Sequence, residues 1–131
     1  MKLNSTINSV NISDNQLFEK LTTIENFKKI MPENISKFEI IDNETLIFSL
    51  KGMPAIKLII DERNSPSKIV MKSSESKIIF SLTANIQKID NDSCNFELEF
   101  NGDLNPMIQM MVKSPLQSFI NDLSNNISRL V

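Results

Sequence analysis

The sequence predicts a single α+β domain in which an antiparallel sheet of about seven strands is covered by a long C-terminal helix. Between positions 35 and 103 apolar residues alternate with polar ones, which is the period of strands with one buried face. At the C-terminal end the apolar spacing changes to three and four residues, the period of an α-helix. A sheet with one apolar face must be covered, and the terminal helix is the element suited to cover it.

Length and composition agree with one domain spanning residues 1–131. A chain of 131 residues, 40% hydrophobic and 23% charged, can bury one core without metal or disulfide support. No apolar run approaches the roughly 20 residues that cross a bilayer, and the first ten residues lack the apolar stretch of a signal peptide. The single Cys94 cannot form an internal disulfide, so we expect a cytoplasmic protein.

The residue types exclude several kinds of chemistry. The net charge is −2, lysines are scattered, and Trp and Tyr are absent, so binding of nucleic acid is not expected. The chain has no histidine, which removes Ser-His and Cys-His pairs and imidazole metal ligands. With one cysteine as well, zinc is excluded. We therefore expect neither a metal nor a cofactor.

The N-terminal part predicts one strand and two short helices. Residues 3–10 alternate as a strand, and the residues expected to share one face are Leu3, Ser5, Ile7 and Ser9. Ser13 with Gln16 three residues later is a capping box, which predicts that a helix begins there. A second short helix follows Thr23 and ends at Pro32, because proline cannot continue a helix.

The middle of the chain predicts six strands in an antiparallel meander. Six runs of alternating apolar residues are separated by short stretches rich in Asn, Asp, Ser, Pro and Gly, which are typical of turns. The predicted turns are Asp42–Glu44, Gly52–Pro54, Asn64–Pro66, Ser73–Ser76 and Asp90–Asp92.

The terminal helix is predicted from one apolar stripe. Its members are Leu116, Phe119, Ile120, Leu123, Ile127 and Leu130. Ser114 followed by Pro115 resembles a helix start, so we expect the long helix to begin, or to be sharply kinked, at Pro115. Residues 107–113 would then form a separate turn or two of helix, angled against the main helix and begun by Asn105-Pro106.

Met107, Met110 and Met111 share one face of that preceding segment. Three interpretations are open. Unbranched thioethers adapt to different apolar shapes, so the methionines can form a pliable lip over a cavity. They can instead pack against Phe18, Phe27 or the strand ends, or they can dock a protein partner.

The order of elements over the whole chain resembles the helix-grip superfamily (SRPBCC), which includes START-like lipid-transfer domains, the birch-pollen-allergen family and polyketide cyclases. The segment 103–107, with 110–112 and 114–117, is similar to a small bacterial subgroup of it. The resemblance implies a curved sheet wrapped around the terminal helix, two short helices between strands 1 and 2, and a cavity that takes bulky apolar molecules. Asn101-Gly102 departs from the pattern because it is typical of a hairpin turn, and it predicts a bulge or bend.

The predicted cavity wall combines the inward phase of the sheet with residues of the helices. These residues are Phe27, Phe48, Leu58, Ile60, Met71, Phe80, Leu82, Phe96, Leu98, Phe119 and Leu123. The same stripe can simply fill a core.

No catalytic residue is predicted. Glu97 and Glu99 alternate with apolar residues and should face solvent, while Ser5 and Ser9, expected on the inner face, have no base beside them. Cys94 is expected to be a half-buried structural residue, because no His or Arg lies near it in the sequence to lower its pKa.

The leading hypothesis is therefore non-catalytic binding, transport or sensing of a small hydrophobic ligand of the lipid, sterol-like, quinone or polyketide class. One alternative is an enzyme of the polyketide cyclase or hydratase type that acts on an apolar substrate. Another is a protein-interaction module that docks through Met107–Val112.

Overall fold

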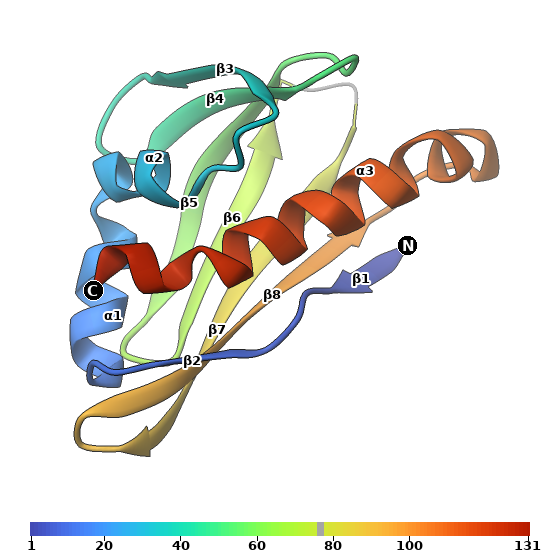
Figure 1. Ribbon diagram of the computed structural model, residues 1–131. Coiled ribbons are helices and arrows are strands. Elements are labelled where there is room, and N and C mark those ends of the chain that lie inside the picture. The colour runs from blue at the N-terminus through green and yellow to red at the C-terminus, as the bar shows by residue number, and fades with distance from the viewer. Residues whose placement is uncertain (76–77) are drawn as a thin grey trace.

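Figure 1 shows the computed structural model of the chain, which describes residues 1–75 and 78–131. The helical elements are α1 (Asp14–Thr22), η1 (Ile24–Asn26), α2 (Phe27–Ile30), α3 (Pro106–Asn125) and η2 (Ile127–Leu130). The strands are β1 (Lys2–Asn4), β2 (Asn8–Val10), β3 (Ile35–Ile40), β4 (Thr45–Leu50), β5 (Ile56–Asn64), β6 (Lys68–Ser74), β7 (Phe80–Asp90) and β8 (Ser93–Gly102).

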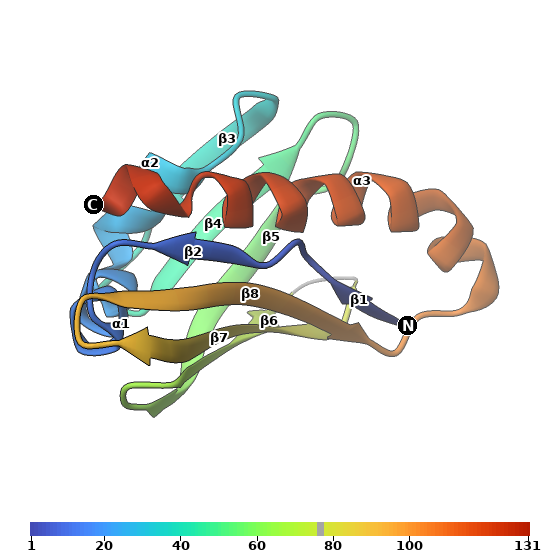
Figure 2. The ribbon, with the colours of Figure 1, turned by 60° about the horizontal axis from the view of Figure 1, so that its bottom comes forward.

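These strands form one antiparallel sheet with seven positions in the order β1-β8-β7-β6-β5-β4-β3, and β2 also pairs with β8. The sheet curls around α3, which lies across its concave side (Figures 1 and 2). Both short helices, α1 and α2, sit at the end of the sheet where α3 finishes. The predicted α+β helix-grip architecture is confirmed.

The capping box at the start of α1 is confirmed. The Gln16 N–H donates to Ser13 Oγ at 3.2 Å, and the Ser13 N–H donates to Gln16 Oε1 at 3.2 Å. The predicted turn Ser73–Ser76 begins inside a strand, because β6 runs to Ser74, and residue 76 lies outside the described residues.

The predicted single strand over residues 3–10 is in fact two short strands. The register against β8 shifts by one residue between β1, where Leu3 opposes Phe100, and β2, where Asn8 opposes Phe96. A shift of one residue turns every later side chain to the other face. Ser5 is therefore buried, but Ile7 and Ser9 are exposed, and the prediction that all of them share one face is wrong.

Ser5 marks the point at which the strand is interrupted. Its N–H donates to the Leu98 carbonyl at 2.8 Å, and its Oγ accepts the Leu98 N–H at 2.8 Å. The hydroxyl thus takes the place of a backbone carbonyl in the ladder. Because the backbone leaves the regular ladder at the next residues, the peptide groups of Thr6 are free to bond to α3.

An amide clasp, formed by Asn4, Thr6, Asn8, Gln117, Asn121, Ser124 and Asn125, joins this interruption to α3. The Thr6 N–H donates to Asn121 Oδ1 at 3.1 Å, and Ser124 Oγ donates to the Thr6 carbonyl at 2.7 Å. Asn8 Nδ2 donates to Ser124 Oγ at 2.8 Å. The clasp holds the C-terminal half of α3 against the sheet edge, while the apolar stripe of the same helix faces the concave side.

Replacing Ser124 with alanine should lower the free energy of unfolding by about 1 to 2 kcal/mol, because the fully buried Ser124 hydroxyl bonds to both Asn8 Nδ2 and the Thr6 carbonyl, and each of those groups loses one of its partners. Urea unfolding followed by circular dichroism measures the change. Ser118→Ala, at an exposed position of the same helix, should change it by less than about 0.5 kcal/mol. Equal effects of the two variants would contradict the clasp.

α3 is one helix that begins at Pro106, so the prediction that it begins at Pro115 is wrong, whereas the alternative, a sharp kink at Pro115, stays a prediction. Asn105 is its cap, with Oδ1 accepting the Ile108 N–H at 3.0 Å, and residues 107–113 belong to the same helix. Pro115 is tolerated inside the helix because it is exposed. The carbonyl four residues earlier, at exposed Met111, can bond to water in place of the missing N–H.

The bulge predicted at Asn101-Gly102 is also wrong, whereas the alternative, a bend there, stays a prediction. β8 continues to Gly102, which opposes Phe80 without a break in register. The glycine is required by a close approach, because a Cβ there would lie 3.0 Å from Phe100 Cε1 and 3.2 Å from Phe80 Cβ. The rings of Phe80 and Phe100 stack at 4.8 Å beside it.

Candidate functional site

The structure brings the eleven predicted wall residues into one apolar cluster. None of them exposes more than 6% of its surface. They come from α2 (Phe27), β4 (Phe48), β5 (Leu58, Ile60), β6 (Met71), β7 (Phe80, Leu82), β8 (Phe96, Leu98) and α3 (Phe119, Leu123). The prediction that these side chains point inward is confirmed. Their role as walls of a ligand cavity stays a prediction.

The sheet and α3 meet directly within this cluster. The rings of Phe48 on β4 and Phe119 on α3 stack with centroids 4.8 Å apart and planes 8° apart. Both side chains are buried. This contact joins α3 to β4, next to the edge strand β3, so a ligand bound at that point would have to displace it.

The buried side chains of the described residues include no Asp, Glu, Lys or Arg, and the ionisable group among them is the thiol of Cys94. The buried polar residues are Ser5, Thr45, Ser49 and Ser124. Ser49 Oγ donates to the Met53 carbonyl at 2.9 Å, and the Ser5 hydroxyl is part of the strand ladder. The interior that the structure describes therefore offers an apolar molecule van der Waals contact, without a carboxylate or amine to move a proton.

The charged residues of β8 lie on the outer face, as predicted. Glu97 and Glu99 alternate with buried residues, and Glu99 pairs with Lys2 at 2.8 Å. Hydrogen bonding to Glu99, together with its charge, raises the pKa of Lys2. This ion pair is solvated and joins β1 to β8, so its role is structural.

Cys94 is fully buried in β8. Burial raises the pKa of its thiol, and the charge of Asp14 adds to the increase. A thiol with a raised pKa and no access to solvent is a poor nucleophile. The prediction that Cys94 is a structural residue agrees with its position, although it is more deeply buried than expected.

The three methionines of α3 face solvent. Met107, Met110 and Met111 expose 74%, 86% and 71% of their surfaces, whereas Val112 of the same segment is buried. The interpretation that they pack against Phe18 or Phe27 is wrong, because α1 and α2 lie at the opposite end of α3 (Figure 1). We call Met107, Met110 and Met111 the methionine patch.

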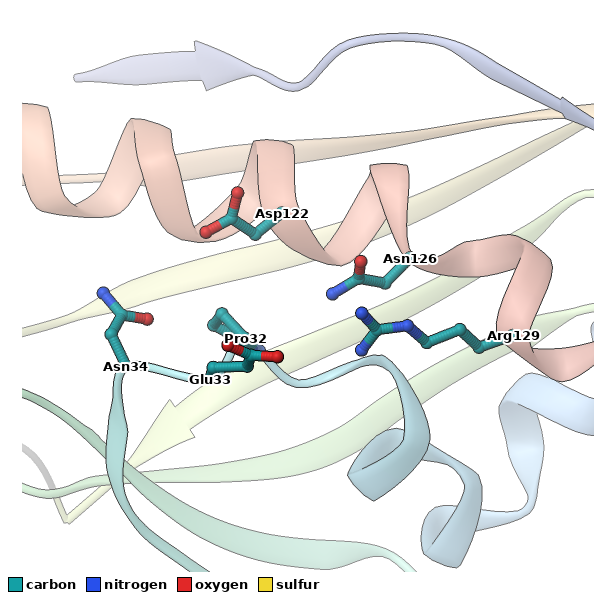
Figure 3. Close-up of a pocket in the computed structure, with 6 residues that line it drawn as sticks. All are labelled: Pro32, Glu33, Asn34, Asp122, Asn126 and Arg129. Carbon is teal, nitrogen blue, oxygen red and sulfur yellow. The ribbon is translucent and has the colours of Figure 1, made fainter.

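The hollows found on the described part of the molecule are open and lie on its outside. One of about 400 Å³ lies beside the methionine patch and is lined by Met110, Lys113, Ser114, Gln117 and Ser118. Another of about 330 Å³ lies between the end of α3 and the segment that leads into β3 (Figure 3). None of the five hollows identified there opens between the sheet and α3.

The hollow in Figure 3 is polar and was not singled out from the sequence. It is lined by Pro32, Glu33, Asn34, Asp122, Asn126 and Arg129. Asn126 Nδ2 donates to the Ile30 carbonyl at 3.0 Å, so that amide joins α3 to α2. Of the other lining residues, Glu33 and Asp122 are acidic and Arg129 is basic. This mixture of charges indicates no ligand class.

The described residues show neither a metal-binding cluster nor a membrane-spanning helix. Residues 1–75 and 78–131 contain no group of three or more Cys, Asp or Glu side chains placed to hold a metal ion. The helices within those residues include none that is both long and apolar enough to pass through a bilayer.

Comparison by sequence gives no relatives: no protein-family model matches the chain, and neither does any curated protein. Comparison of structures gives many similar chains. Norcoclaurine synthase from Thalictrum flavum, in complex with dopamine and hydroxybenzaldehyde, has a TM-score of 0.76 at 15% identity over 99% of this chain and 85% of that one.

Two bacterial structures are similar over nearly their whole length. A START superfamily protein from Mycobacterium smegmatis has a TM-score of 0.70 at 12% identity, covering 99% of both chains. The protein XoxI from Bacillus cereus has a TM-score of 0.75 at 7% identity, covering 98% of this chain and 93% of that one. Identities this low establish a common fold and nothing more.

Proposed function

We propose that this chain, which has the START-like (SRPBCC) helix-grip fold, binds a small apolar molecule between its sheet and α3 and carries or senses it without catalysis. The observation that supports this most is the composition of the interior. Eleven large apolar side chains converge there, and no Asp, Glu, Lys or Arg of the described residues is buried with them. A norcoclaurine synthase structure of the same fold holds dopamine and hydroxybenzaldehyde. We propose a lipid, sterol-like, quinone or polyketide ligand.

Binding requires the first half of α3 to move. The stacked Phe48 and Phe119 close the interior, and the amide clasp holds α3 from Gln117 onward. Before Pro115 the helix contacts the interior mainly through Ile108 and Val112. Pro115 has no N–H, so α3 lacks one internal hydrogen bond between its two halves. We propose that the ligand enters beneath residues 106–114, with the methionine patch as the outer lip of that entrance.

The exposed methionine patch also favours a second candidate function, docking of a protein partner. Solvated thioethers adapt well to an apolar partner surface, and the 400 Å³ hollow lies beside Met110. Lys113 is the only charged residue between Leu104 and Asn121, so this face of α3 has little charge. If the chain functions by docking a partner, its interior is a packed core and not a ligand site.

Catalysis finds less support. A cyclase or hydratase needs a positioned proton donor or acceptor next to its substrate. Apart from the thiol of Cys94, the buried polar side chains of the described residues are hydroxyl groups, and those of Ser5 and Ser124 are already engaged with the backbone. Cytoplasmic location stays a prediction.

Native mass spectrometry of protein purified from its own host tests the proposal. Ligand binding predicts a species heavier than the 14.9 kDa chain by one small molecule, and this extra mass should disappear after extraction with organic solvent. A variant with Met107, Met110 and Met111 all changed to Gln should keep the added mass. If the bare chain is the only species, and apolar compounds do not raise its melting temperature, the proposal is wrong.

A further inference from the structure

β3 is the free edge of the sheet. The strand order ends at β3, whereas the other edge, formed by β1 and β2, is joined to α3 by the amide clasp. Figure 1 shows β3 at the rim of the sheet, with no element beyond it. A strand edge of this kind presents unpaired N–H and C=O groups that can bond to another strand.

The hydrogen bond at the end of β3 indicates which of its peptide groups point outward. The Ile41 N–H donates to the Thr45 carbonyl at 2.9 Å, so position 41 is bonded to β4. In an antiparallel pair the bonded positions alternate, and the register from Lys37 to Ile40 is continuous. Positions 37 and 39 are therefore also bonded to β4. The N–H and C=O groups of Phe38 and Ile40 therefore point away from the sheet, while Ser36 lies at the register irregularity between Ile35 and Lys37.

We propose that β3 pairs antiparallel with β3 of a second copy of this chain, centred on Phe38. In this register Phe38 opposes Phe38 of the other copy, so outward-pointing peptide groups meet there, and Ile40 opposes Ser36 at the register irregularity. Lys37 then opposes Glu39 of the other copy, twice, at positions that are not hydrogen-bonded and where side chains lie closest. Lys37 and Glu39 are both exposed, and the ion pair that they form with each other within one chain is long, at 4.0 Å, so it can exchange for the pairs between copies.

Charge selects this register over its neighbours. The symmetric register centred on Lys37 would place Lys37 directly opposite Lys37, and the one centred on Glu39 would place Glu39 opposite Glu39. Like charges directly opposite each other destabilise a strand pair. Registers shifted by a single residue would set outward-pointing groups against groups already bonded to β4. Of these three symmetric registers, only the one centred on Phe38 places opposite charges across from each other.

The expected dimer is weak. A pair of six-residue strands is a small interface, with exposed Ile40 and Ile41 as its added apolar surface, and interfaces of this size are typical of transient association. We therefore expect a dissociation constant in the range of about 1 μM to 1 mM. This inference does not depend on whether the interior binds a ligand.

Sedimentation equilibrium at protein concentrations up to about 1 mM tests the pairing. Wild type should dimerise, and Ile40→Pro should remain monomeric, because proline removes an outward N–H without touching the β3–β4 ladder. Ile40→Thr keeps that N–H and should dimerise. A wild type that stays monomeric, or an Ile40→Pro variant that dimerises as wild type does, would overturn the proposal.

Two charge variants provide a test that does not depend on tolerating proline. Lys37→Glu alone and Glu39→Lys alone each create two like-charge pairs, so each should raise the dissociation constant about tenfold or more. An equimolar mixture of the two variants restores opposite charges at both positions and should associate as wild type does. If the mixture associates no better than the separate variants, β3 does not pair in this register.

Discussion

The Leu82→Glu variant is expected to lose all measurable binding of a fluorescent fatty-acid probe. Leu82 lies on β7, is 2% exposed and points into the apolar cluster. The described residues bury no Lys or Arg that could pair with a carboxylate there, and burying an unpaired charge costs several kcal/mol. An apolar ligand would meet either that charge or the water it brings in. Titration of the probe, followed by its fluorescence, measures the loss.

Ser81→Glu is the matched control for this prediction. Ser81 is the preceding residue on the same strand, but it lies on the outer face and opposes Lys72 of β6. The same substitution there should leave probe binding unchanged. Circular dichroism must show that Leu82→Glu is folded, and Leu82→Asn provides a milder change if it is not. A folded Leu82 variant that binds the probe as tightly as Ser81→Glu does would mean that the ligand lies elsewhere.

The Phe119→Ala variant is expected to lose about 3 to 5 kcal/mol of unfolding free energy. The ring of Phe119 is buried and stacks on Phe48, so its removal takes away the direct contact between α3 and the sheet and leaves a void. Domains of this size have total stabilities of about 5 to 15 kcal/mol, so the variant should be close to unfolding at 37 °C. Urea unfolding at 25 °C measures the loss.

Met110→Ala on the same helix is the control, because the side chain is exposed and its removal should change stability by less than about 0.5 kcal/mol. An apolar void stays dry and accepts small apolar molecules, so benzene should restore part of the stability of Phe119→Ala but not raise that of Met110→Ala. If the Phe119→Ala loss is below about 1 kcal/mol, the ring does not hold α3 to the sheet.

Most of the architecture was predictable because it depends on hydrophobic period alone. Alternation identified the strands of the meander, and the apolar stripe from Leu116 to Leu130 identified the terminal helix. The errors fall at positions where tertiary contacts override a local pattern. Pro115 resembles a helix start, but its exposed position lets the helix continue through it. Gly102 resembles a turn residue, but it is required by the nearby Phe100 ring.

The burial of the candidate residues was predictable, but the openness of the interior was not. Phase along the strands and the apolar spacing of the helices decide which side chains point inward, so the burial of all eleven residues follows from the sequence, while their role as cavity walls stays a prediction. Whether space remains between them depends on side-chain packing, such as the Phe48–Phe119 stack, which no sequence period encodes. The amide clasp was missed, although Gln117, Asn121 and Asn125 recur at a spacing of four residues beside the apolar stripe.

The amide clasp and the methionine patch lie on different halves of α3. The half after Pro115 is held by hydrogen bonds to the N-terminal segment. The half before it carries exposed methionines and, through Ile108 and Val112, fewer contacts with the core. If the domain opens, it should therefore open at the end of the sheet where α3 begins.

Quenching of a single tryptophan by a brominated fatty acid tests the central claim most directly. The chain has no Trp and no Tyr, so Phe119→Trp reports only from the interior and Met110→Trp only from the outer face of α3. Bromine quenches tryptophan on close contact. A ligand bound between sheet and helix should quench the fluorescence of the tryptophan at position 119 in a saturable manner. It should leave the fluorescence of the tryptophan at position 110 unchanged. Quenching at position 110 alone would contradict interior binding and would assign the apolar contact to the methionine patch.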